Sequence, residues 1–118
     1  MKIEAATTKA TDRIEVLADR AVYRLERSAR AGASRASLEK AANKAKKGFS
    51  SPARSGYAQV TREVGTAMIR MRSAEEYTTD LQDDLFFARE VAGGTLEDAV
   101  QAARTRVDEA LAAVPATP

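Results

Sequence analysis

Apolar residues recur every seven positions between Tyr57 and Ala92, in two series that are set three residues apart, and only Thr78 interrupts the first series. A 3-4-3-4 spacing places these side chains along one seam of an α-helix, and such a seam is normally covered by another helix. The pattern therefore predicts packing partners and carries no chemistry. The seam residues that we expect helix packing to bury are Tyr57, Val60, Val64, Met71, Leu81 and Leu85.

The same periodicity, combined with capping signals, predicts an all-α fold without strands. Pro52 follows a serine that can cap a helix, and it suits the first turn of that helix. Gly93–Gly94 predicts a turn that sends the last helix back antiparallel. We expect a single domain over 1–118, an elongated helical bundle or hairpin. The predicted helices cover about 8–31, 37–47, 52–92 and 95–114.

The long third helix has one weak region, near residues 73–79. Ser73 begins a segment with the form of a capping box, and the β-branched pair Thr78 and Thr79 disfavours helix, so a break there is the alternative. We expect continuity over 52–92 because the seven-residue phase is the same on both sides. A continuous helix would be about 60 Å long. It would have to project from a compact chain whose radius of gyration is about 13 to 14 Å.

Phe86 and Phe87 directly follow the seam residue Leu85 and point to the two flanks of the seam. Val91 lies one turn after Phe87 and extends its flank. The returning last helix could cover one flank or, in a local three-helix core, both. An aromatic flank that stays exposed would mark a partner site. Phe86, Phe87 and Val91 are therefore candidate anchors for a protein partner.

The composition limits the chemistry that this chain can perform. It contains no His, Cys or Trp, and so lacks the usual ligands of zinc, copper and iron–sulfur centres, cysteine nucleophiles and imidazole-dependent triads. Ala supplies 25 of the hydrophobic residues, so helix formation is easier to explain than a self-sufficient core. Self-association or a partner is expected to help. Without a membrane span or signal peptide, the protein is expected in the cytoplasm or in a particle assembled there.

Charge is separated along the chain although the formal net charge is only +2. Residues 27–55 carry eight cations against one acid, a net charge of +7, and residues 73–98 carry eight acids against one cation, a net charge of −7. Such blocks can pair within one molecule, between copies or with other partners. The acidic block lacks the histidines of a di-metal carboxylate site and the glycine-containing turn of a calcium loop. We expect it to be a solvated or partner-facing surface.

The basic block has two interpretations. Lysines in the last turn of a short helix complement the helix dipole and remain solvated. Alternatively, the block binds the phosphates of nucleic acid. Few aromatic residues lie nearby, so binding would be to the backbone without base stacking. The candidate phosphate-binding residues are Arg30, Arg35, Lys40, Lys44, Lys47 and Arg54.

These features predict a non-enzymatic structural, assembly or adaptor protein that packs against copies of itself or against partner subunits. A bacterial or phage particle, in which the chain would be a virion component, is one such complex. The alternative is a sequence-nonspecific nucleic-acid-binding protein that uses residues 27–55, and a carboxylate enzyme is a third class. No cofactor, metal, small-molecule substrate or membrane partner is expected.

Overall fold

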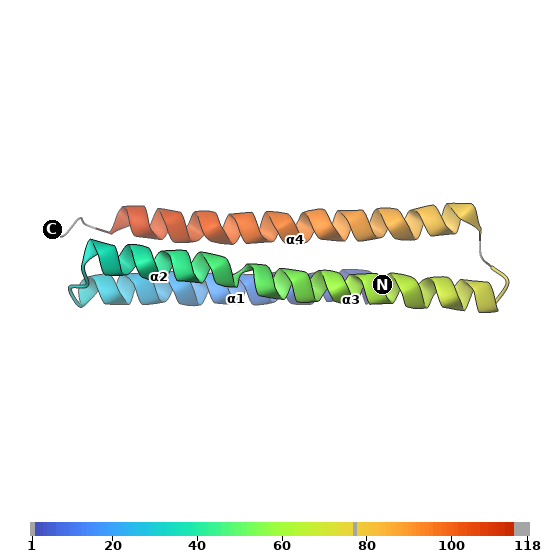
Figure 1. The fold of residues 1–118 in the computed structure, drawn as a ribbon, viewed down its shortest axis with the longest axis horizontal. Helices are drawn as coiled ribbons and strands as arrows, with labels where there is room; N and C mark the ends of the chain where they lie inside the picture. Colours follow the sequence, from blue (N-terminus) through green and yellow to red (C-terminus); the bar gives the residue numbers. More distant parts are fainter. Residues whose placement is uncertain (1, 77, 115–118) are drawn as a thin grey trace.

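A computed structural model of the chain describes residues 2–76 and 78–114. Its helices are α1 (Lys2–Arg30), α2 (Arg35–Gly48), α3 (Ser50–Ser73) and α4 (Thr79–Ala113). They form an elongated bundle of 68 × 17 × 16 Å (Figure 1). α1 and α4 run in one direction, and α2 and α3 follow each other end to end in the opposite direction. The prediction of an elongated all-α bundle is confirmed.

α1 begins at Lys2, several residues before the predicted start. Ile3 is buried, so the apolar stripe of the helix extends nearly to its first residue. The helix ends before Gly32, whose positive φ of 89° favours glycine, and two backbone hydrogen bonds close the turn. Ser34 then caps α2 by accepting a hydrogen bond from the backbone N–H of Ser37.

A single residue, Phe49, separates α2 from α3. Pro52 lies in the first turn of α3. In a continuous helix it could not donate a hydrogen bond to the carbonyl of Gly48, four residues earlier, because proline has no N–H. Its ring would also crowd that carbonyl. The proline therefore divides what would otherwise be one helix. α3 begins at Ser50, two residues before the predicted start, and Phe49 is buried among residues of α1, α2 and α4.

The prediction of a continuous helix over 52–92 is wrong, and the alternative of a break near 73–79 is correct. α3 ends at Ser73, and Glu75 has a left-handed backbone with φ 57°, in a turn that two backbone hydrogen bonds close. The hydroxyl of Thr78 accepts a backbone N–H from the first turn of α4. The sequence showed no break in phase because both helices use the same seven-residue spacing.

The predicted turn at Gly93–Gly94 is also wrong, because α4 passes through both glycines as one helix of 35 residues. Ala92 and Leu96 on either side are buried. Their packing offsets the roughly 1 kcal/mol that each glycine costs in a helix interior. Gly93 lies at a close approach, since a Cβ there would be 3.3 Å from the ring of Tyr57.

The core consists of two clusters along the rod. The larger one joins α1, α2 and α4 around Phe49. The smaller one lies where α1 begins and consists of Ile3, Val60, Val64 and Ala92, from three helices. Among the described residues no charged side chain is buried. The first turn of α1 therefore marks the point beyond which α3 and α4 continue alone.

Candidate functional site

One end of the described structure consists of two helices instead of three. We call residues 65–73 of α3 and 79–91 of α4 the arm. Ile3 packs against Val64 and Ala92, just before the arm begins. Figure 1 shows α3 and α4 continuing past the N-terminal end of α1. At 1.5 Å per residue, the α4 side of the arm is about 20 Å long.

The interior of the arm is a contact between two helices and is only partly closed to solvent. Met68, Leu85, Phe86 and Ala88 are half-buried and pack against the smaller core cluster. The guanidinium carbon of Arg89 lies 5.0 Å from the centre of the Phe86 ring, a cation–π arrangement. In the body of the molecule, in contrast, α1 closes the equivalent space.

The two most exposed large apolar side chains of the described structure, Phe87 and Ile69, lie in the arm, and Val91 of the arm is slightly less exposed than Tyr23 of α1. Phe87 is 67% exposed, Ile69 is 66% exposed and Val91 is 51% exposed. Phe87 and Val91 are four residues apart on α4 and share one face of the helix, and acids lie three and four residues from Phe87. We call this set of exposed residues the acidic face of the arm: Asp80, Asp83, Asp84, Phe87, Glu90 and Val91.

The three predicted partner anchors have different environments. Phe86 is half-buried between the arm helices, whereas Phe87 and Val91 are exposed. No returning helix covers either flank in the described part of the chain, because α4 runs straight through Gly93–Gly94. The local three-helix core that was one predicted option is therefore absent around Phe87.

The predicted seam changes its environment along the rod. Val60 and Val64 are buried, Met71 and Leu85 are half-buried, and Tyr57 and Leu81 are exposed. Burial is complete only where α1 lies over the seam. The ring of Tyr57 borders the open groove between α3 and α4.

Most of the predicted phosphate-binding residues lie on α2 or beside its first turn, toward the end of the molecule opposite the arm, whereas Arg54 lies in α3 at the groove with α4. Five of them, Arg30, Lys40, Lys44, Lys47 and Arg54, are exposed. Arg35 differs, because it donates a 2.8 Å hydrogen bond to the carbonyl of Leu111 and pairs with Glu39 at 3.3 Å. Arg35 therefore links α2 to α4 and is less available to a ligand than the others.

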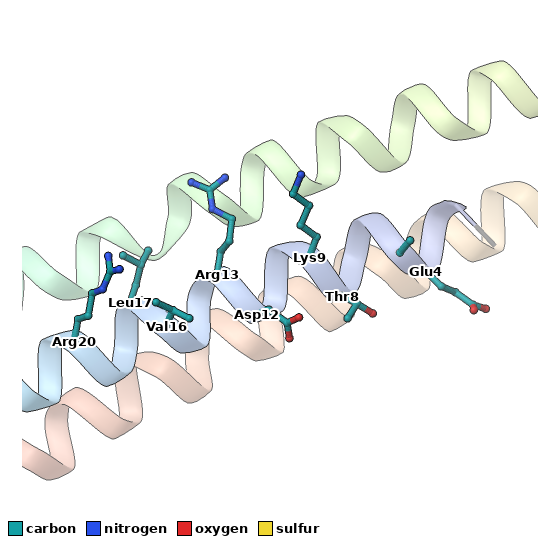
Figure 2. A pocket seen from close by; sticks show the side chains of 9 residues that line it. Glu4, Thr8, Lys9, Asp12, Arg13, Val16, Leu17 and Arg20 are labelled. Carbon is teal, nitrogen blue, oxygen red and sulfur yellow. The ribbon is translucent and has the colours of Figure 1, made fainter.

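Sequence analysis missed a row of cations on one flank of α1. They recur at spacings of seven and four residues, at Lys2, Lys9, Arg13, Arg20 and Arg24. In Figure 2, Lys9, Arg13 and Arg20 extend toward the α2–α3 side of α1, and Glu4 and Asp12 extend away from it. Counting charge by segments concealed this row because acids on the other flank cancel it. The spacing test used for apolar residues would have found it.

Besides the hollow along α1 that Figure 2 shows, which has Glu4 and Asp12 in its lining, two grooves border this cationic flank. The groove between α1 and α2, which we call the α1–α2 groove, has a volume of about 360 Å³ and no acidic lining residue. Its cations are Arg20, Arg24 and Lys44. Its accessible apolar residues are Leu17, Ala41 and Ala45, and the buried residues Ala21, Leu25 and Phe49 lie beneath them. The second groove, between α1 and α3, has Lys2, Lys9, Arg13 and Arg62 but also Glu63 in its lining.

The two blocks of opposite charge lie mostly at opposite ends of the molecule, residues 27–55 around α2 and residues 73–98 largely in the arm (Figure 1). The ion pairs among described residues are Arg35–Glu39, Lys46–Asp108 and Arg106–Asp19. None of these three joins the two blocks. Among the described residues, therefore, no ion pair joins the two blocks within one molecule. Pairing between copies and pairing with other partners are the two options that this leaves.

Within residues 2–76 and 78–114, no acidic side chains cluster in threes in a way that could hold a metal ion. No helix in these ranges combines the length and the apolar character that crossing a membrane requires. Comparisons of the chain with protein families, curated proteins and solved structures find no match. The arm and the grooves beside α1 are therefore the features from which a function is inferred.

Proposed function

We propose that this protein is a non-enzymatic assembly or adaptor subunit that binds another protein through its arm. The observation that carries the proposal is the exposure of Phe87 and Val91 on one face of the arm. Burying a Phe or Val side chain contributes about 1.5 to 3 kcal/mol relative to leaving it exposed. A partner that covers this face gains that contribution, and aromatic residues commonly dominate the energetics of protein interfaces.

The packing of the body supports this proposal. Along Val60 and Val64, α1 completes a three-helix cross-section and removes the seam from solvent. The arm continues the same spacing through Leu85 and Ala88 but leaves both half-buried. A partner at the arm would thus meet a half-buried seam beside the exposed face of Phe87 and Val91, which continues a face of α4 that is exposed in the body as well.

The charge of the acidic face restricts the partners that fit it. Asp83, Asp84 and Glu90 surround Phe87, and the acidic face contains no cation. A partner that places cations around an apolar centre would be attracted, whereas an acidic one would be repelled. The arm therefore favours a basic, partly apolar protein surface.

Nonspecific binding of nucleic acid is a second candidate function. The cations of the α1–α2 groove, with Lys40 and Lys47 exposed nearby, favour contact with phosphates. Titration of duplex DNA at about 50 and 200 mM salt tests this candidate, since phosphate contacts would make affinity fall steeply with salt. The arm proposal expects no saturable binding at either concentration.

Photo-crosslinking tests the arm proposal directly. The full chain would be produced in its own cells with a photoreactive phenylalanine analogue in place of Phe87. The control carries the analogue in place of Tyr23, an exposed aromatic residue of α1. We expect a discrete protein adduct from position 87 and none from position 23. Equal adducts from both positions, or none from position 87, would contradict binding through the arm.

A further inference from the structure

Resting on the proposed function, we infer that the partner of the arm is a second copy of this chain. The acidic face of one arm docks in the α1–α2 groove of another molecule. The two surfaces lie at opposite ends of a 68 Å rod, so one molecule cannot satisfy both by itself.

The chemistry of the two surfaces is complementary in two ways. The acidic face places Phe87 and Val91 among four carboxylates. The α1–α2 groove places the solvent-accessible residues Leu17, Ala41 and Ala45 among three cations and no acid. Docking would therefore bring apolar side chains against apolar side chains and each rim against opposite charge. The α1–α3 groove fits less well, because Glu63 lines it.

The lengths of the two surfaces also match. The acidic face extends along α4 from Asp80 to Val91, and the α1–α2 groove extends along α1 from Leu17 to Ser28. Each interval covers eleven residue steps, or about 17 Å of helix. An amphipathic helix lying in an apolar groove is a common mode of protein recognition.

This contact joins two different surfaces, so each molecule keeps one free arm and one free groove. Association of this heterologous type continues head to tail, and it ends only if the geometry closes a ring. The expected product is thus a chain or ring of many copies, in contrast to a pair that buries its two arms together.

Charge reversal on each surface tests the inference. The arm variant is Asp83→Lys, Asp84→Lys and Glu90→Lys. The groove variant is Arg20→Glu, Arg24→Glu and Lys44→Glu. The control has the same change in net charge as the groove variant but lies outside the groove: Lys40→Glu, Lys47→Glu and Arg54→Glu. All substituted residues are exposed, and circular dichroism checks that each variant keeps its helices.

Mass would be measured by light scattering against protein concentration at about 50 mM salt, where screening of surface charge is limited. The unmodified chain should associate beyond a dimer as its concentration rises. The arm variant and the groove variant should each associate on the order of 100-fold more weakly. The chain with both sets of changes should recover association because its charges are again opposite. The control should behave as the unmodified chain.

Three results would overturn the inference. The first is an unmodified chain that stays monomeric over the whole concentration range. The second is a groove variant that associates normally, since the arms would then pair with each other. The third is a groove variant that loses only affinity for duplex DNA. If one of these results is found but position 87 crosslinks to a different protein, the proposed function stands and only the self-association is refuted. If position 87 gives no crosslink at all, both the proposed function and the self-association are refuted.

Discussion

The body and the arm share one seven-residue pattern but differ in burial. Val64 and Leu81 were predicted from the same seam, yet Val64 is 2% exposed and Leu81 is 39% exposed. The pattern decides which face of a helix meets its neighbours, whereas the number of neighbours decides how much of that face leaves solvent. Val60 and Val64 become core where α1 lies over the seam, whereas Leu81 in the arm stays at the surface, as does Tyr57 of the body at the open groove between α3 and α4.

The two phenylalanines Phe49 and Phe87 give the largest expected contrast between these regions. Phe49→Ala should lower the free energy of unfolding by about 3 to 5 kcal/mol, because it leaves a cavity in the larger core cluster. Phe87→Ala removes an exposed ring and should change it by no more than about 0.5 kcal/mol.

Urea unfolding followed by circular dichroism measures both changes. Dilute protein in high salt keeps the chain monomeric, so that a second molecule does not add to the effect at Phe87. If Phe49→Ala does not fold, Phe49→Leu provides a milder change at the same site. Equal losses at Phe49 and Phe87 would show that the arm is covered in the monomer.

Two glycines of α3 give a smaller contrast of opposite sign. A Cβ at Gly56, in the body, would overlap the Cβ of Ala10 in α1, whereas a Cβ at Gly65, in the arm, would meet open space. Gly56→Ala should therefore destabilise the fold by about 1 to 3 kcal/mol through overpacking. Gly65→Ala should stabilise it by about 0.5 to 1 kcal/mol through helix propensity.

Adding Ala10→Gly to Gly56→Ala is the matched control, and it should restore part of the lost stability. Thermal or urea unfolding of the unmodified chain, Gly56→Ala, Ala10→Gly and the double variant would measure the coupling. A stabilising Gly56→Ala would mean that α1 and α3 are further apart than the structure has them. The body would then be no more tightly packed than the arm.

Much of this architecture could be predicted from sequence because helix formation is local. Periodicity and the glycine at position 32 specify helices and one turn with little help from tertiary contacts. The straight path of α4 through Gly93–Gly94 could not be predicted, because burial of Ala92 and Leu96 against other helices overrides two unfavourable residues. The sequence also did not predict how far α3 and α4 extend past the first residues of α1, which is what creates the arm. That distance depends on how whole helices align.

The candidate surfaces were predicted in part for a similar reason. Phe87 and Val91 could be recognised as off-seam apolar residues, but whether another helix covers them depends on topology. The α1–α2 groove was missed because its cations come from Arg20 and Arg24 on one helix and Lys44 on the next. A count of charge along the chain averages over both flanks of α1 and cannot show a row confined to one of them.

The smallest expected effect concerns Glu75, at the turn between the arm helices. Its φ of 57° is unfavourable for a residue with a Cβ, so Glu75→Gly should stabilise the turn. Greater freedom in the unfolded chain offsets part of this gain, which leaves about 0.5 to 1 kcal/mol.

Glu76→Gly is the control at the next residue, which does not have a positive φ. It should be neutral or destabilising in the same urea titration. Amide hydrogen exchange in residues 66–72 and 80–88 would show whether the gain is confined to the arm, because local openings there are independent of the body. A continuous helix through this region would give the opposite result. Glycine would then destabilise at either position by roughly the 1 kcal/mol that it costs in a helix interior.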